Sequence, residues 1–195
     1  MCYLEARVLP FVVSLDDAQA AEAPLVGLRA ARLARLRQAG LPVPDGFVVT
    51  AEVFRTAPHG EITPDVEAAI AAAYAGLGAG AVAVRPSTVT PAGGEVGGFA
   101  SFHPLAGLGK LVRQIERCWQ SATGPEARAA CAGQGVEVDQ VALAVLVQAL
   151  APAAPAGAPA DPGGQLAARA EAALGGPHRL EWAAGAPWII DARPE

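Results

Sequence analysis

Two spacings of apolar residues run through the chain, and each predicts one kind of secondary structure. In residues 107–123, four apolar side chains recur at the three- and four-residue spacing of a helix face: Leu111, Ile115, Cys118 and Trp119. Residues 141–150 form a continuous apolar run, which is typical of a strand that is covered on both faces. The alternation of helical and extended segments predicts an α/β (α+β) domain.

Start and stop residues set the limits of the other predicted elements. Pro64 begins one helix, Gly40 and Pro42 end another, and Thr50 is expected to cap a short helix in which Phe54 packs inward. The segments predicted to be helical are 25–38, the turn after Thr50, 64–77, 107–123 and 165–174. The segments predicted to be extended are 3–13, 46–50, 81–85, 98–103, 141–150 and a C-terminal β-hairpin around residues 184–187. These segments predict a mixed sheet flanked by helices.

Length and local composition indicate one domain. A chain of 195 residues suits a single domain, and a hydrophobic fraction of 52% excludes a disordered chain. Residues 151–164 are rich in Ala, Pro and Gly, as in a linker. We therefore expect one domain, 1–195, with a main body (1–150), this linker, and a C-terminal part (165–195) that holds a helix and the hairpin.

Charge and cysteine content exclude several classes of protein. A net charge of -5 with only 17% charged residues argues against nucleic acid as a partner. No apolar run approaches the roughly 20 residues that span a bilayer, and the first residues lack the cationic start of a signal peptide, so a cytoplasmic location without a membrane partner is expected. Cys2, Cys118 and Cys131 match neither a disulfide framework nor a zinc spacing, and no metal site is predicted.

Arginines provide the first candidate chemistry. Arg85 ends a predicted buried strand and precedes a loop of Pro, Ser, Thr and Gly (86–98), an arrangement that is typical of anion binding. Arg29, Arg32 and Arg35 step by three along the flank of a predicted helix. By spacing alone, these three indicate a solvated basic face.

Two carboxylates in the predicted hairpin provide the second candidate chemistry. A three-residue hairpin loop would set Glu181 directly opposite Asp191 on one face, whereas a two-residue loop would put Asp191 on the other face. Two adjacent carboxylates repel, so that the pair would hold one proton near neutrality and offer one acid and one base. A salt bridge from Glu181 to Arg193 or Arg85 is the alternative interpretation.

Three further side chains have both a functional and a structural interpretation. His103 could enter the same cleft as a second base, or it could be structural beside its aromatic neighbours. Trp182 could stack on a flat ligand, or it could pack across the hairpin. Glu95 lies in the glycine-rich loop and could supply an acidic group there.

Five segments have matching counterparts, in the same order, in one known family. They are APLVGLRAARLARLRQAGLPVPDGFVVTAEVFR (23–55), VAVRPST (82–88), GFASFH (98–103), VLVQALAPAAPAG (145–157) and LEWAAGAPWIIDARPE (180–195). They resemble the N-terminal nucleotide-binding domain of phosphoenolpyruvate synthase and pyruvate phosphate dikinase. The resemblance implies an ATP-grasp-type fold that closes on ATP and magnesium, and transfer of phosphate from ATP toward a histidine on a separate domain.

The nucleotide-contacting positions are only partly kept in this comparison. Gly27-Leu28-Arg29 stands where the family has Gly-Gly-Lys, and an arginine is not equivalent to that lysine. Arg85 matches the family's phosphate-contacting arginine and Ser87 matches a serine that follows it, but the next acidic pair is absent. Ser101 and Phe102 replace the Gly and Gln of the family's Phe-Ala-Gly-Gln segment.

The C-terminal segment departs further from the family's sequence pattern. Glu181 matches the family's metal-binding glutamate, while Asp191 replaces the glutamine of Gln-Ala-Arg-Pro. Between the linker and His178 the family has a long segment with a Gly-Leu-Gly-Glu element, which is reduced here to one predicted helix. The resemblance therefore implies a truncated, degenerate relative with a reduced ATP-grasp-type fold.

These features favour a repurposed, nucleotide-independent enzyme of specialised (natural-product) metabolism that needs no cofactor and takes a small-molecule substrate. Its chemistry would be hydration, dehydration or cyclisation of a carbonyl-rich compound, of lyase, hydrolase or cyclase type. The predicted catalytic residues are Glu181, Asp191, Arg85 and His103, and the predicted ligand-binding residues are Arg29, Ser87, Ser101 and Trp182. Two alternatives remain open: a non-catalytic binding or partner protein, including a homodimer, and a residual phosphotransferase that uses ATP and magnesium.

Overall fold

A five-stranded sheet forms the centre of the protein. The computed structural model describes residues 10–57, 60–150, 163–183 and 188–194. The sheet has the order β1-β2-β5-β3-β4 and consists of β1 (Val12–Ser14), β2 (Gly46–Val49), β5 (Ala142–Ala149), β3 (Val82–Val89) and β4 (Phe102–Leu105). Its described pairings are all antiparallel, whereas the sequence predicts a mixed sheet.

A two-stranded hairpin and the helices complete the fold. The hairpin pairs β6 (His178–Trp182) with β7 (Ile189–Pro194) and forms a sheet of its own. The helices are α1 (Ala23–Gln38), α2 (Ala51–Thr56), α3 (Pro64–Gly76), α4 (Leu108–Gln120), α5 (Pro125–Gly133) and α6 (Gly163–Leu174), with short 3-10 turns at Ala18–Ala21, Ser121–Thr123 and Val138–Gln140. The predicted α/β (α+β) class, the flanking helices and the C-terminal hairpin are thereby confirmed. No helix in the described ranges is long and apolar enough to cross a membrane.

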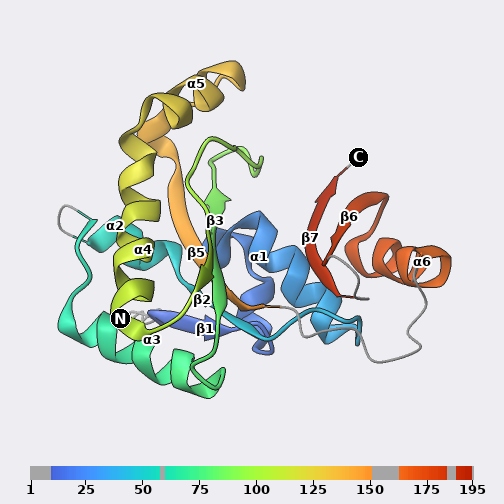
Figure 1. Cartoon of the computed structure of the whole chain (residues 1–195). Helices are drawn as coiled ribbons and strands as arrows, with labels where there is room; N and C mark the ends of the chain where they lie inside the picture. Colours follow the sequence, from blue (N-terminus) through green and yellow to red (C-terminus); the bar gives the residue numbers. More distant parts are fainter. Residues whose placement is uncertain (1–9, 58–59, 151–162, 184–187, 195) are drawn as a thin grey trace, which may run out of the picture.

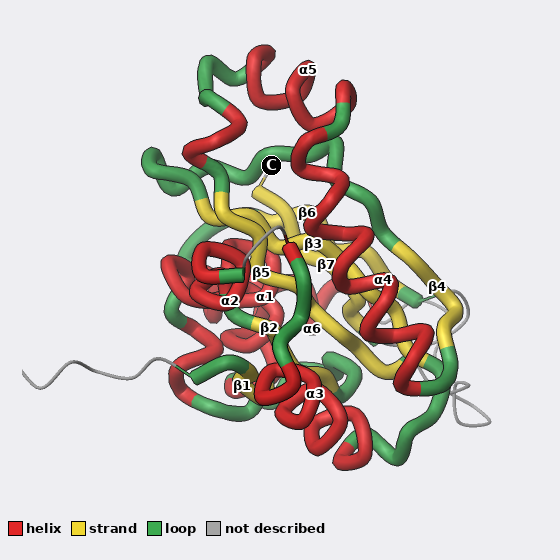
Figure 2. Tube along the Cα trace, turned by 90° about the vertical axis from the view of Figure 1, so that its left-hand side faces the viewer, coloured by secondary structure: helices red, strands yellow, loops and turns green. Residues whose placement is uncertain are grey.

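Helices cover both faces of the sheet (Figure 1). On one face, α1, α6 and the hairpin pack together; on the other, α2, α3 and α4 do so, and in Figure 2 α4 crosses in front of the strands. The central strand β5 explains this arrangement because its side chains alternate between two apolar clusters. Those of Ala142, Ala144 and Leu146 join the first cluster, and those of Leu143, Val145 and Val147 join the second.

The apolar cluster against α2, α3 and α4 contains the buried aromatic side chains of the described residues, Phe47, Tyr74 and Trp119. Trp119 is buried there, contacts Phe54 edge to face and donates a hydrogen bond from Nε1 to the carbonyl of Leu143 (3.2 Å). Ile115 and Cys118, from the same face of α4, are also fully buried. The helical spacing seen in the sequence thus predicts correctly which side of α4 meets the sheet.

Strand β3 is longer than predicted, so that Arg85 lies in its middle and not at its end. The strand continues through Pro86 to Val89, a segment that the sequence predicts to be a loop. The carbonyl of Pro86 accepts a hydrogen bond from Arg29, so this carbonyl points away from β5. In an antiparallel strand the N–H of a residue points the same way as its carbonyl, and the N–H that proline lacks would therefore face this outer edge. The proline therefore removes no hydrogen bond between β3 and β5.

Other boundaries differ in detail. Thr50 occupies the position before α2, but its hydroxyl donates to the carbonyl of Pro10 (2.9 Å) and makes no cap hydrogen bond. Helix α5 was not predicted, and the predicted strand 98–103 is observed as β4, which begins four residues and ends two residues further along. Most of the predicted strand 3–13, most of the linker 151–164 and the hairpin loop lie outside the described residues.

Candidate functional site

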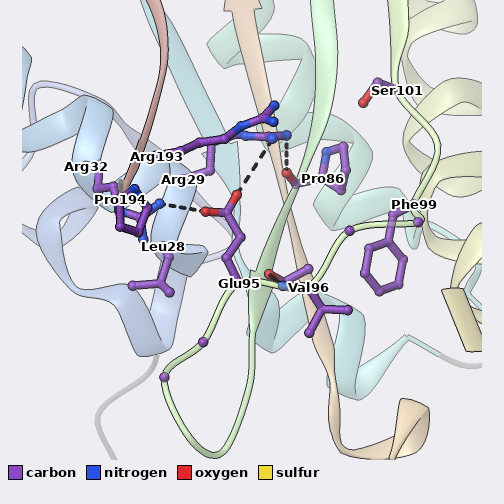
Figure 3. A pocket seen from close by; sticks show the side chains of 15 residues that line it. Leu28, Arg29, Arg32, Pro86, Glu95, Val96, Phe99, Ser101, Arg193 and Pro194 are labelled. Carbon is purple, nitrogen blue, oxygen red and sulfur yellow. Dashed lines mark hydrogen bonds and ion pairs between the residues drawn. The ribbon is translucent and has the colours of Figure 1, made fainter. Parts of the chain in front are cut away.

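A cleft of about 520 Å³ lies where α1, the outer edge of β3 and the end of β7 meet the glycine-rich loop, residues 90–98 (Figure 3). We call it the arginine cleft. Three of its lining side chains are Arg29, Arg32 and Arg193, and the other polar ones include Glu95 and Ser101. Cations from two separate elements therefore face one hollow.

A break in α1 brings this helix against β3. Gly27 has φ 77° and ψ 164°, which is not helical, and a Cβ atom at this position would lie 2.4 Å from both the carbonyl oxygen and Oγ of Ser87. Beyond the break, the backbone N–H of Ala30 donates to Ser87 Oγ (3.0 Å). Ser87 is completely buried. The predicted ligand-binding serine thus holds the helix, and the glycine permits the close approach.

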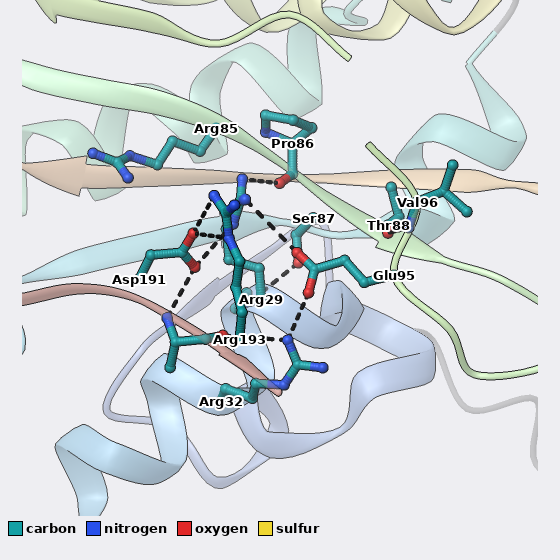
Figure 4. A network of polar contacts seen from close by, with 12 residues as sticks. Arg29, Arg32, Arg85, Pro86, Ser87, Thr88, Glu95, Val96, Asp191 and Arg193 are labelled. Atoms are coloured by element: carbon teal, nitrogen blue, oxygen red, sulfur yellow. Dashed lines mark hydrogen bonds and ion pairs between the residues drawn. The ribbon is translucent and has the colours of Figure 1, made fainter. Parts of the chain in front are cut away.

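Arg29 and Arg32 are fixed by several partners each. Arg29 donates from Nε to Asp191 Oδ1 (3.2 Å) and from Nη1 to the carbonyl of Pro86 (3.1 Å), and its Nη2 lies 3.7 Å from Glu95 Oε1. Arg32 donates from Nη1 to Glu95 Oε2 (2.6 Å) and to the carbonyl of Ala192 (3.2 Å). Because these contacts reach β3 and β7, the two guanidinium groups link the hairpin to the main sheet (Figure 4).

Asp191 is the buried anion behind this cluster. Its side chain is 1% exposed, and it accepts hydrogen bonds from Arg29, from Arg193 Nε (2.9 Å) and from the backbone N–H of Ala192 (3.0 Å). The contact with Asp191 raises the pKa of Arg193. Since its acceptor positions are occupied by these donors, Asp191 is arranged to orient arginines.

Arg85 and Glu181 lie beside the cluster. The Arg85 guanidinium donates to the carbonyl of Ile190 (3.4 Å), and no ion pair joins it to a carboxylate in the described ranges; Figure 4 shows it next to Asp191. Burial lowers the pKa of Arg85, and the nearby Arg29 lowers it further, against the opposite effect of Asp191 and Glu181. Asp191 and Glu181 therefore both lie close enough to Arg85 for their charges to affect it.

Of the two arrangements predicted for Glu181 and Asp191, the one with the residues directly opposite each other is observed. Their Cα atoms are paired across the hairpin, and a register shift between Glu181 and Trp182 accompanies this pairing. The predicted loop, 184–187, lies outside the described residues. Glu181 is exposed while Asp191 is buried, and the described carboxylate that pairs with Arg193 is that of Asp191, not that of Glu181. The two carboxylates therefore occupy unequal environments.

The predicted site residues are only partly brought into the cleft. Arg29 and Ser101 line it, whereas Arg85, Glu181 and Asp191 are not among its lining residues.

His103 is exposed on the edge strand β4 and is not a lining residue of the arginine cleft either. Trp182 packs against the apolar cluster of the α1 face, opposite Ile189, as in the structural interpretation of this side chain.

The solvated basic face predicted for the arginines of α1 is wrong for two of them. Arg32 is only 8% exposed and Arg29 is nearly as buried, while Arg35 is exposed. A step of three residues falls about 60° short of a full helical turn, so the three arginines do not share one face. That drift was a usable signal, but the partner carboxylates of Arg29 and Arg32 could not be identified from spacing.

The carboxylates of the cluster do not fit magnesium. Magnesium in nucleotide sites is held by carboxylate and phosphate oxygens. Here Asp191 and Glu95 are engaged by arginines, and among the described residues no group of three or more His, Cys, Asp or Glu side chains could hold a metal ion. The guanidinium groups, in contrast, are suited to an anion such as carboxylate or phosphate.

One comparison with known proteins gives a match. A family model described as pyruvate phosphate dikinase, AMP/ATP-binding domain, matches residues 57–159, just over half of the 195 residues. The matched segment includes β3, the glycine-rich loop and β5. No curated protein matches the chain.

Proposed function

The chain belongs to the family of the pyruvate phosphate dikinase AMP/ATP-binding domain, and from this premise we propose that its arginine cleft is a reused nucleotide site. The sheet, its helices and the hairpin form a reduced ATP-grasp-type domain. In our proposal the cleft binds a small anionic, carbonyl-rich compound, and the protein acts on it without a nucleotide. The reaction class is hydration, dehydration or cyclisation, as in specialised metabolism.

The observation that carries this proposal is the convergence of Arg29, Arg32 and Arg193 on one cleft. A guanidinium group matches the two oxygens of a carboxylate, or two oxygens of a phosphate, with parallel hydrogen bonds. The cleft is partly enclosed by the glycine-rich loop, so that its charges are screened less than surface charges.

Nucleotide independence is supported by the donor set. Phosphoryl transfer requires a metal ion that neutralises the phosphates, together with cations on the transferred group. The described carboxylates nearest to the cleft are engaged by arginines, and the family's lysine position holds Arg29. These features favour an anion that needs no bound metal.

Glu181 and Arg85 do not line the arginine cleft but lie beside the arginines that do, and they are the proposed reacting groups for a substrate held by those arginines. The Glu181 carboxylate would take a proton from the carbon next to a carbonyl group, and the electron pair of that C–H bond would form the C=C bond of an enolate. The negative charge would then reside on the oxygen, where Arg85 stabilises it. Return of the proton to carbon, or to a departing hydroxyl group that leaves as water, restores the carboxylate. Asp191 has a positioning role, since it holds Arg29 and Arg193.

Deuterium exchange into 2-oxoglutarate tests the proposal, because this compound is anionic and has acidic hydrogens next to a ketone. We expect the wild type to accelerate exchange at C3 in D₂O, followed by proton NMR. Glu181→Gln should reduce the acceleration by at least about 100-fold, since general-base catalysis contributes that much. Glu67→Gln, an exposed carboxylate on α3, is the matched control and should behave as the wild type.

Binding measurements separate the alternatives. Calorimetric binding of 2-oxoglutarate without any exchange would overturn the catalytic part and favour a non-catalytic binding protein. The family match favours a second candidate, residual ATP-dependent phosphotransfer. Binding of Mg-ATP at micromolar Kd would favour that candidate and overturn nucleotide independence.

A further inference from the structure

Glu95 occupies the arginine cleft from within the chain. Its two carboxylate oxygens reach different arginines: Oε2 accepts from Arg32 Nη1 at 2.6 Å, and Oε1 lies 3.7 Å from Arg29 Nη2. Figure 3 shows this side chain extending from the glycine-rich loop toward both guanidinium groups. A carboxylate of this chain therefore sits where an anionic ligand would bind.

The backbone around Glu95 is held on both sides. The carbonyl of Glu95 accepts from Gln134 Nε2 (3.2 Å), and the N–H of Val96 donates to Thr88 Oγ1 (3.2 Å). Val96 itself is buried in the apolar cluster of the opposite face, and the hydroxyl of Thr90 donates to the carbonyl of Gly94 (2.9 Å). The loop is thus anchored before and after Glu95.

The side chain of Glu95 has no such anchor apart from the arginines. It is 22% exposed, and its described polar contacts are those with Arg29 and Arg32. The arginines do have other partners, since Arg29 also contacts Asp191 and Pro86, and Arg32 also contacts Ala192. Rotation of one side chain would therefore open the site and leave both guanidinium groups in position.

We propose that Glu95 is an internal substitute for the ligand, and that the cleft takes a small dianion which displaces the Glu95 carboxylate from Arg29 and Arg32. The inference rests on the proposed function, because it takes the arginine cleft as the binding site. A protein whose own carboxylate competes with the ligand binds that ligand more weakly, by the fraction of molecules in which the site is open.

The charge of the cleft indicates a dianion. With Glu95 in place, three guanidinium groups of the cleft lining (Arg29, Arg32 and Arg193) face two carboxylates, those of Glu95 and Asp191, while Arg85 and Glu181 beside the cleft add one charge of each sign. When Glu95 turns outward, the three cations face Asp191 alone. Two positive charges are then in excess, which a dicarboxylate or a phosphate group would neutralise.

Calorimetric titration of wild type and Glu95→Gln with three anions tests this inference. Malonate and inorganic phosphate at pH 8 are the dianions, and acetate is the monoanion. We expect Glu95→Gln to bind the dianions about tenfold more tightly than the wild type, because the competing charge is removed. The dianion that binds more tightly identifies the chemistry of the ligand as dicarboxylate or phosphate. Acetate should bind weakly to both proteins.

Two further variants control for folding and for surface charge. Glu95→Asp keeps the charge but is one methylene shorter, so it should reach the arginines less well and tighten malonate binding by a smaller factor. Glu67→Gln removes a carboxylate from the opposite face of the sheet and should leave every Kd unchanged. Thermal unfolding of each variant shows that the comparison is between folded proteins.

The outcomes distinguish this inference from the proposed function. Equal malonate affinities of wild type and Glu95→Gln would show that Glu95 does not compete, while the cleft remains a binding site. If Glu95→Gln gained as much affinity for acetate as for the dianions, the inference that the ligand is a dianion would be wrong. Absence of binding by every anion to both proteins would overturn the proposed function itself.

Discussion

The two faces of strand β3 show how one sheet serves two purposes. Val82 and Val84 point into the apolar cluster beneath α3 and α4, whereas Arg85 and Ser87 point toward α1 and the hairpin. Successive side chains of a strand alternate between faces, so neighbours in sequence enter different environments. Both faces of the sheet carry an apolar cluster, but only on the α1 face does β3 also contribute polar side chains that join the arginines.

The difference teaches where stability and function are located. Burial of large apolar groups is the dominant favourable contribution to folding. A buried ion pair contributes much less, because the cost of removing both charges from water offsets their attraction. We therefore expect substitutions beneath α4 to affect stability most, and substitutions around the arginine cleft to affect anion binding most.

The largest expected effect comes from breaking the apolar face. Trp119→Ala should lower the free energy of unfolding by about 3–5 kcal/mol, through a cavity and the lost hydrogen bond to Leu143. Trp182→Ala makes the same change on the opposite face, where the side chain is only partly buried, and should cost less than half as much. Urea denaturation measures both values. Equal losses would contradict the assignment of stability to the α4 face.

A smaller effect is expected where α1 meets β3. Gly27→Ala should cost about 2–3 kcal/mol of stability and weaken malonate binding, because the new Cβ would meet Ser87 at 2.4 Å and displace Arg29. Gly78→Ala is the matched control: its φ of 78° is similar, but nothing lies within 4 Å of the added Cβ. That variant should lose only about 1 kcal/mol, the cost of a positive φ at a residue with a side chain, and keep its affinity. A similar loss at both positions would show that the close approach is unimportant.

The smallest effect concerns the cysteines of the apolar face. Burial raises the pKa of the Cys118 thiol to about 12 and also raises the pKa of Cys131. The folded protein keeps these protons to higher pH than the unfolded chain, so the stabilisation is complete below the ordinary pKa of 9.0 and is lost as the pH rises toward 12. Relative to Cys118→Ala, the wild type should lose on the order of 1 kcal/mol between pH 8 and pH 10. Parallel urea titrations at both pH values check this, and parallel stability curves would refute it.

The fold was predicted largely from apolar spacing. The continuous run of β5 and the helical face of α4 correspond to elements whose burial is periodic, and periodicity is visible in sequence. The sequence predicts that β3 ends at Arg85, before Pro86, but the strand continues to Val89. The outer edge that tolerates a proline exists only after the strands have assembled. The antiparallel direction of the strands was likewise not visible in the spacing of apolar residues.

The candidate site was predicted in part. The pairing of Glu181 with Asp191 was one of two arrangements predicted from hairpin geometry, which is a local property, and the register of the folded hairpin decided between them. The burial of Arg32 could not be predicted from local geometry, because its partner Glu95 lies 63 positions away in the sequence. Spacing within one helix cannot show which distant loop will cover it.

The sequence by itself determined which side chains of each element are apolar, and therefore which faces are buried, because this information repeats within a few residues. Only the tertiary structure decided that Asp191 orients arginines, that Ser87 supports α1, and that Glu95 fills the arginine cleft. The reason is physical: a charged or polar group acts through its nearest partners, and folding chooses those partners from distant parts of the chain.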